Sequence, residues 1–153
     1  MSLPEIKALP VASIAEDDSV LLMWAIDPML PQALEVIESW GFVYKTVGFY
    51  WVKTNIVSNG YFTGLGYYTR ANAEQCLLAT RGKGLKRISK SVRRLVVAPR
   101  RRHSEKPEIV RERIESLFGK IPRVELFARL RAPGWDVFGD EAPGSIDLGV
   151  PRL

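Results

Sequence analysis

The segment between residues 94 and 129 constrains the fold more than any other part of this chain. Residues 95–97, Leu-Val-Val, form an apolar and β-branched run that predicts a short buried strand. A helix is expected to begin at Pro107, whose missing N–H costs nothing in a first turn, and to end at Gly119. A second apolar run, residues 124–128, predicts the next strand. This order favours a right-handed crossover between two parallel strands.

A basic loop, residues 99–106, separates the first of these strands from the helix. It holds three consecutive arginines and the only histidine of the chain. In open α/β sheets, ligands bind beyond the carboxyl ends of the strands. The basic loop follows one such end, and residues 129–131, Arg-Leu-Arg, follow another. We therefore expect a binding site at these ends.

The rest of the chain continues the alternation of strands and helices. Strands are predicted over residues 20–25, 44–53 and 75–80, and helices over residues 2–9 and 31–40. The first of these strands is apolar throughout, which indicates a strand covered on both faces, as in a parallel sheet. The pattern predicts an α/β protein, a three-layer sandwich with a mostly parallel sheet.

Length and composition indicate one folded domain. The chain has 153 residues, of which 46% are hydrophobic, so a disordered chain is not expected. The domain is predicted over residues 1–141, and the tail, residues 142–153, is rich in proline and glycine and is expected to be loosely held. No apolar run is long enough to span a bilayer, and residues 1–10 do not resemble a signal peptide. A cytoplasmic protein with no membrane partner is expected.

Cysteine and histidine usage excludes several kinds of chemistry. The single cysteine excludes an internal disulfide and every multi-cysteine metal site. His103 has no second histidine to share a metal with, so no metal is predicted. His103 and Ser104 are adjacent in a loop and do not present a base to a hydroxyl, and no G-x-S-x-G motif occurs.

Charge is distributed unevenly along the chain. Residues 81–103 contain ten Lys or Arg and no Asp or Glu, whereas the remainder carries a net charge of −5. A polyanion such as nucleic acid is the expected partner of the basic segment. The alternative is a solvated loop of ordinary basic residues.

The aromatic and acidic residues near the middle of the chain leave alternatives open. Glu74 enters an apolar run, so it is either paired, with Arg70 as a candidate, or functional. Residues 54–72, which contain three glycines, predict a loop. Tyr67, Tyr68 and, further on, Trp135 lie in loops, where each is either an ordinary loop residue or a platform that stacks on a base. Asp27 and Pro28 form a turn that starts a helix.

Seven short segments occur together in a characteristic order and spacing. They are LMW (22–24), WGF (40–42), WVKTN (51–55), EQCL (74–77), HSEKP (103–107), ELFAR (125–129) and PGW (133–135). Together they resemble the adenine-N6 methyltransferases of the MT-A70 class over residues 1–141. Residues 64–80 are more similar to the phage and bacterial branch than to the eukaryotic one.

The resemblance implies a Rossmann-like fold that binds S-adenosylmethionine. By family motif, Lys106 contacts the methionine carboxylate of the cofactor through a charge-assisted bond. Arg129 and the polar pair Asp140 and Glu141 hold the ribose and neighbouring groups. The family usually has Asn rather than Asp at position 140.

The resemblance also implies a nucleic-acid substrate, with DNA favoured over RNA. Arg100, Arg101, Arg102 and His103 are expected to contact the substrate backbone, and Arg70 is assigned the same role. The reaction implied is direct methyl transfer to the N6 amine of adenine.

One departure from the family pattern is clear in the sequence. The catalytic tetrapeptide Asp-Pro-Pro-Trp is absent, and residues 27–30, Asp-Pro-Met-Leu, do not align with it. The resemblance therefore implies a methyltransferase domain that lacks its N-terminal catalytic segment, and no catalytic residue is assigned. The alternative function is a non-catalytic nucleic-acid-binding subunit. An incomplete sheet would expose a strand edge, which leaves a homodimer or heterodimer open.

Overall fold

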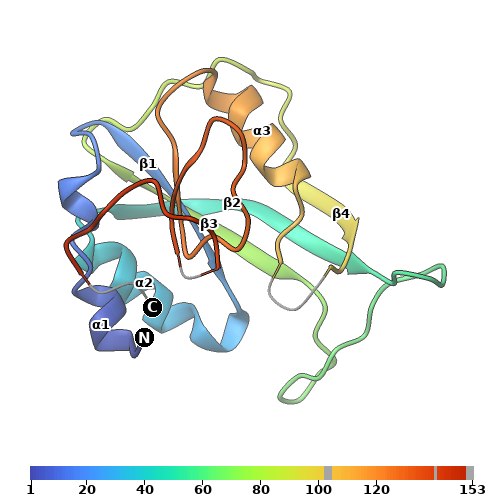
Figure 1. The fold of residues 1–153 in the computed structure, drawn as a ribbon. Helices are drawn as coiled ribbons and strands as arrows, with labels where there is room; N and C mark the ends of the chain where they lie inside the picture. Colours follow the sequence, from blue (N-terminus) through green and yellow to red (C-terminus); the bar gives the residue numbers. More distant parts are fainter. Residues whose placement is uncertain (102–104, 140, 151–153) are drawn as a thin grey trace.

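The computed structural model describes residues 1–101, 105–139 and 141–150, which form a four-stranded sheet, a separate two-stranded sheet and three α-helices (Figure 1). The larger sheet has the strand order β1-β3-β2-β4. Its strands are β1 (Ser19–Ala25), β2 (Val43–Thr54), β3 (Glu74–Arg81) and β4 (Leu95–Pro99). The alternation of strands and helices is therefore confirmed as an α/β fold.

The prediction of a mostly parallel sheet is wrong. Of the three pairings that the described residues make in this sheet, β1–β3 and β2–β3 are antiparallel, and β2–β4 is parallel. Parallel neighbours need a crossover connection, usually a helix, whereas antiparallel neighbours can be joined directly. The connection from β2 to β3 contains no helix, so β3 returns antiparallel beside β2.

The apolar runs 20–25 and 95–97, which were expected to be buried strands, lie at the two edges of the larger sheet as β1 and β4. Within the described residues, β1 pairs with β3 alone and β4 pairs with β2 alone. In β4, Val96 is 1% exposed, whereas Leu95 and Val97 are each 55% exposed. Strand residues alternate between faces, and α3 covers one face of β4, so every second side chain remains exposed.

Helices pack on both faces of the larger sheet. Short helix α1 (Leu3–Lys7) and α2 (Leu30–Ser39) contribute to one core, where Val36 and Ile37 of α2 are buried together with Leu77 of β3. A short 3₁₀ helix, Asp27–Met29, leads into α2, which confirms the turn predicted at Asp27. Helix α3 (Ile109–Phe118) covers the other face, where Val110 packs with Trp51 and Val96.

The last two strands form their own parallel sheet. Strands β5 (Val124–Leu126) and β6 (Asp136–Phe138) pair with each other, so the predicted direct crossover from β4 to β5 within one sheet is wrong. Leu126 and Phe138 pack into the core on the α2 side, and neither strand pairs with β4 in the described part of the chain. The described part of the tail also packs: Leu148 lies in the same core, and Ser145 donates a backbone hydrogen bond to Val137 at 2.9 Å.

Candidate ligand site at the carboxyl edge of the sheet

Side chains from β1, β2, β3 and the loop before α3 come together at one edge of the larger sheet. Because β3 is antiparallel to its neighbours, its first residues lie beside the last residues of β1 and β2. Ala25 pairs with Gln75, and Trp51 pairs with Glu74. The end of β4 joins them, since Pro99 pairs with Thr54. We call this region, where β1, β2 and β4 end and β3 begins, the carboxyl edge. It is not the side of the sheet formed by an edge strand.

Two lysines and one glutamate meet at the carboxyl edge, and we call them the two-lysine cluster. The Nζ atom of Lys53, on β2, lies 2.7 Å from Oε1 of Glu74. The Nζ atom of Lys106, in the loop before α3, donates to Oε2 of the same carboxylate. The Glu74 side chain is 13% exposed. Glu74 is therefore paired, as one alternative expected, but with Lys53 and Lys106 rather than with Arg70.

Two tryptophans line the cluster. Trp24 of β1 and Trp51 of β2 pack edge to face, with ring centroids 6.3 Å apart. Lys53 lies 5.2 Å from the centroid of Trp51, and Lys106 lies 5.4 Å from the centroid of Trp24, so each ammonium group faces an aromatic ring. Trp51 is fixed by a hydrogen bond from Nε1 to the Ala98 carbonyl at 3.0 Å. The rings and the carboxylate together hold both lysines in place.

The electrostatics of the cluster favour an anionic ligand. Burial raises the pKa of the Glu74 carboxyl, but hydrogen bonds and charges from Lys106 and Lys53 outweigh burial, and the pKa lies below its ordinary value of 4.5. Glu74 is thus ionised at neutral pH and balances one of two ammonium groups. One positive charge is left over, in a half-buried site where charges interact more strongly than in water.

A second group of predicted site residues lies at the carboxyl ends of β5 and β6. Arg129 and Glu141 form an ion pair there at 3.4 Å, and both side chains are exposed. The two strand ends approach closely: a Cβ on Gly139 would lie 2.6 Å from the Ala128 carbonyl oxygen. Phe127 adopts φ +60°, an uncommon conformation for a residue other than glycine. Asp140, the third residue of this group, lies outside the described residues.

The two groups belong to different sheets. Lys106 contacts Glu74 and Arg129 contacts Glu141, and within the described part of the chain no recorded ion pair or hydrogen bond joins one group to the other. That both residues grip one cofactor therefore stays a prediction.

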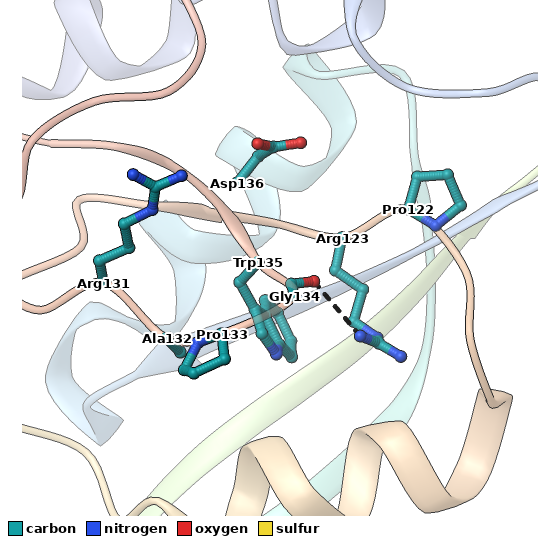
Figure 2. A pocket seen from close by; sticks show the side chains of 8 residues that line it. All are labelled: Pro122, Arg123, Arg131, Ala132, Pro133, Gly134, Trp135 and Asp136. Carbon is teal, nitrogen blue, oxygen red and sulfur yellow. Dashed lines mark hydrogen bonds between the residues drawn. The ribbon is translucent and has the colours of Figure 1, made fainter.

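A hollow of about 560 Å³ lies at the opposite, amino end of β5 and β6 (Figure 2). Figure 2 shows Arg123 and Arg131 on different sides of it, and Arg123 donates to the Gly134 carbonyl at 3.3 Å. Trp135, one of the residues predicted as a possible base platform, donates from Nε1 to Glu115 at 2.8 Å and packs beside Arg123. These contacts give Trp135 a structural role. Neither Lys106 nor Arg129 lines this hollow.

The predicted substrate-contacting residues are partly described. Arg100 lies over the Phe62 ring, 4.5 Å from its centroid, and Arg101 pairs with Glu105 and Glu108 at 3.2 Å each. Arg70 is exposed in the loop between β2 and β3. Arg102 and His103 lie outside the described residues.

Sequence reasoning missed Lys53 as a site residue. The signal in the sequence is a cation directly after the apolar and aromatic run 47–52, at the end of a predicted strand, a position like that of the basic loop after residues 95–97. Its contact with Glu74 depends on β3 lying beside β2, which the sequence does not indicate. Among the described residues, no group of three or more His, Cys, Asp or Glu side chains could hold a metal ion. In the same part of the chain, the helices are too short and too polar to cross a membrane.

The fold and the site define an α/β protein with a cationic, tryptophan-lined site at the carboxyl edge of a mixed sheet. The chain belongs to the MT-A70 family, whose model matches residues 1–141. This family of adenine-N6 methyltransferases is the one that the seven sequence segments indicated. Membership of this chain in the family implies a methyltransferase fold.

Several curated proteins are similar to this chain. The type II methyltransferase M.MunI of Mycoplasma sp is 40% identical over 144 residues, which cover 94% of this chain and 59% of that protein. An MT-A70-like N(6)-adenosine-methyltransferase of Arabidopsis thaliana is 29% identical over 145 residues, covering 92% of this chain and 20% of that protein. The catalytic subunit METTL3 of Homo sapiens is 28% identical over 135 residues, covering 86% and 23%.

The chain thus spans about three fifths of M.MunI and less than a quarter of the other two proteins. These relatives are bacterial and eukaryotic, so they support the bacterial part of the predicted branch and give no support to a phage origin.

Proposed function

We propose that this chain binds S-adenosylmethionine and DNA as part of an adenine-N6 methyltransferase. Membership of the MT-A70 family supports the cofactor and the reaction class, and the similarity to M.MunI supports DNA as the substrate. The observation that carries the proposal is the two-lysine cluster. A half-buried site with one excess positive charge is suited to the carboxylate of an amino-acid moiety.

The residues present fit the cofactor in charge and in access. Lys106 keeps 28% of its side chain exposed while it is paired with Glu74, so a carboxylate can share its ammonium group. Arg129, Glu141 and Asp140 would contact the ribose hydroxyls, which accept and donate hydrogen bonds. When bound, S-adenosylmethionine supplies an electrophilic methyl group. The contribution of this chain is to bind and orient that cofactor.

The basic residues around the carboxyl edge would contact the DNA backbone. Arg100 and Arg101 follow β4 directly, and Arg102 and His103 continue the same loop. Arg70 lies in the neighbouring loop between β2 and β3. Guanidinium groups bind phosphate in a bidentate manner, which fixes the position of a strand without reading its sequence.

A second function is supported by the basic residues at the carboxyl edge, which suit nucleic acid whether or not a cofactor is bound. A chain that uses its fold and these residues for binding alone would serve as a non-catalytic nucleic-acid-binding subunit. A catalytic partner would then supply the reacting groups. In either case we assign no catalytic residue within this chain.

Isothermal titration with S-adenosylmethionine separates the two functions. We expect binding by the unmodified chain, and the Lys106→Ala substitution should weaken it roughly tenfold or more, because a bond to a charged group is lost. Lys7→Ala, which removes a lysine paired with Glu35 on the exposed surface, is the control and should leave cofactor affinity unchanged.

Two outcomes are informative, and one control accompanies them. DNA binding without any cofactor binding would favour the non-catalytic subunit. Equal cofactor affinity in the Lys106→Ala and Lys7→Ala variants would reject the role of Lys106. Circular dichroism of each variant establishes that a loss of affinity does not come from unfolding.

A further inference from the structure

The loop between β2 and β3, residues 55–73, extends from the carboxyl edge as two separate tips, which we call the twin-tip loop (Figure 1). The first tip closes where the backbone N–H of Asn55 donates to the Gly60 carbonyl at 3.1 Å. The second closes where the Gly64 amide donates to the Ala71 carbonyl at 2.7 Å. The loop is therefore folded on itself by backbone hydrogen bonds and projects from the sheet, instead of running directly from β2 to β3.

The base of the twin-tip loop is fixed to the candidate site. The Asn72 side chain accepts from the Lys53 amide at 2.8 Å, and it donates to the Lys53 carbonyl at 2.9 Å and to the Phe62 carbonyl. The Arg100 guanidinium covers the Phe62 ring. Since Lys53 belongs to the two-lysine cluster, these contacts attach the base of the twin-tip loop to that cluster.

The second tip carries two aromatic rings into solvent. Tyr67 and Tyr68 are 94% and 93% exposed, and their rings pack edge to face with centroids 4.9 Å apart. Leu65 on the same tip is 87% exposed. Neighbouring large apolar side chains that remain this exposed mark a contact surface for another molecule.

Charge identifies the kind of partner. Residues 39–104 contain thirteen Lys or Arg and one acidic residue, Glu74, which is already bonded to two lysines. Arg70 lies on the same tip as the two tyrosines. A tip with exposed rings inside a strongly cationic region is complementary to nucleic acid, whose phosphates are anionic and whose bases offer flat faces for stacking.

We propose that Tyr67 and Tyr68 form a base-stacking element of this protein, with Arg70 on the adjacent phosphate. The element would stack on bases that lose a neighbour when the target adenine is turned out of the helix. The stacking beside a turned-out adenine rests on the proposed methyltransferase function, whereas the contact of the two tyrosines with nucleic acid does not. Stacking on an aromatic side chain is tolerant of sequence, so the tip adds affinity rather than recognition of a particular site.

Fluorescence anisotropy with labelled single-stranded and duplex DNA tests the proposal. The double substitution Tyr67→Ala and Tyr68→Ala should weaken binding to single-stranded DNA by roughly tenfold or more. The matched double substitution to Phe keeps both rings and should bind within about twofold of the unmodified chain. Because no charge is removed, the dependence of affinity on salt should keep its slope, whereas Arg70→Ala should lower that slope by about one.

Leu65→Ala is the control for a general apolar contact, because it removes an equally exposed side chain that has no ring. The proposal is overturned if the Ala double variant binds DNA as the unmodified chain does, or if Leu65→Ala weakens binding as much as the loss of both rings. Sedimentation velocity adds a further arm: a dimer that becomes a monomer when the tyrosines are removed would make the tip a self-association surface instead.

Titration of the same variants with S-adenosylmethionine separates this proposal from the proposed function. Absence of cofactor binding, together with tyrosine-dependent DNA binding, rejects the methyltransferase function and leaves the stacking tip in place. Cofactor binding without any effect of the tyrosines on DNA affinity rejects the stacking tip alone.

Discussion

At the scale of single residues, Glu74 determines the geometry of the candidate site. Without its carboxylate, the ammonium groups of Lys53 and Lys106 would face each other across a half-buried space and repel. The carboxylate brings both of them against the tryptophan rings. Removing Glu74 should therefore cost stability as well as change what the site can bind.

The Glu74→Gln substitution should lower the free energy of unfolding at neutral pH by roughly 1–3 kcal/mol, because a charged acceptor is lost from a mostly buried network. The pKa of Glu74 in the folded protein lies below its ordinary value of 4.5. Its contribution is therefore fully present above pH 4.5 and is lost as the pH falls through the folded pKa. Urea unfolding of both proteins across this range measures the difference.

One result would contradict this prediction. If the difference in free energy of unfolding between the unmodified protein and the Glu74→Gln variant does not shrink as the pH falls below 4.5, Gln perturbs packing and not the ion pairs. Glu35→Gln is the matched control, since Glu35 pairs with Lys7 on the exposed surface, where an ion pair contributes little. We expect almost no change of stability for this control at any pH.

At the scale of helices and strands, the sequence predicts the elements better than their arrangement. Predicted and observed bounds agree closely for β2 and α2, because aromatic and β-branched runs, helical periodicity and Gly41 as a stop are local signals. The position of β3 between β1 and β2 is not local. An apolar run such as 20–25 looks the same in a parallel central strand and in an antiparallel edge strand.

A signal for the antiparallel arrangement was nevertheless present. Residues 54–72 contain glycines and aromatics but no helical periodicity, so they could not form the crossover that parallel neighbours require. The candidate site was only partly predictable from the sequence. Lys106 could be assigned from the HSEKP motif, whereas the pairing of Glu74 with Lys53 depends on β2 and β3 lying side by side.

The junction of β5 and β6 gives a prediction at this scale. Gly139→Ala should lower the free energy of unfolding by roughly 2 kcal/mol or more, because the new Cβ would lie 2.6 Å from a backbone oxygen and 2.8 Å from a backbone nitrogen of Ala128. Backbone atoms cannot move aside as a flexible side chain can. Urea unfolding measures the loss.

Gly41→Ala provides the comparison for this prediction. Gly41 has φ +81°, but a Cβ added there would meet no atom within 4 Å, so alanine meets only the conformational cost of roughly 1–2 kcal/mol. If both variants lose the same stability, the close approach of the two strand ends is not what constrains Gly139.

At the scale of the whole molecule, charge is the dominant feature. The basic residues of positions 39–104 outnumber the acidic ones by thirteen to one, although the net charge of the chain is only +5. Acidic residues are concentrated in the remaining segments. The molecule is therefore polarised in sequence, and the connector between β3 and β4 carries much of the positive charge on exposed side chains.

This polarity predicts DNA binding that weakens steeply as salt increases, since each phosphate contact releases counterions. Replacing Lys86, Arg87 and Lys90 in the connector with alanine should lower the slope of log K against log salt by about one for each contact removed. Lys120→Ala, outside the basic region, should leave the slope unchanged. Anisotropy titrations over a series of salt concentrations measure it, and a flat profile for the unmodified chain would reject the electrostatic mode of binding.

The position of Cys76 has a practical consequence. Cys76 is 1% exposed on β3, where it lies in the same core cluster as Phe49 and Trp51, and burial raises the pKa of its thiol to about 12. The one sulfhydryl of the chain is thus almost entirely protonated and screened from reagents while β3 stays between its neighbours. A thiol-modifying dye added to the intact protein would consequently react only with molecules in which β3 has separated from its neighbours. The rate of labelling would therefore report the rate or the extent of opening of the sheet.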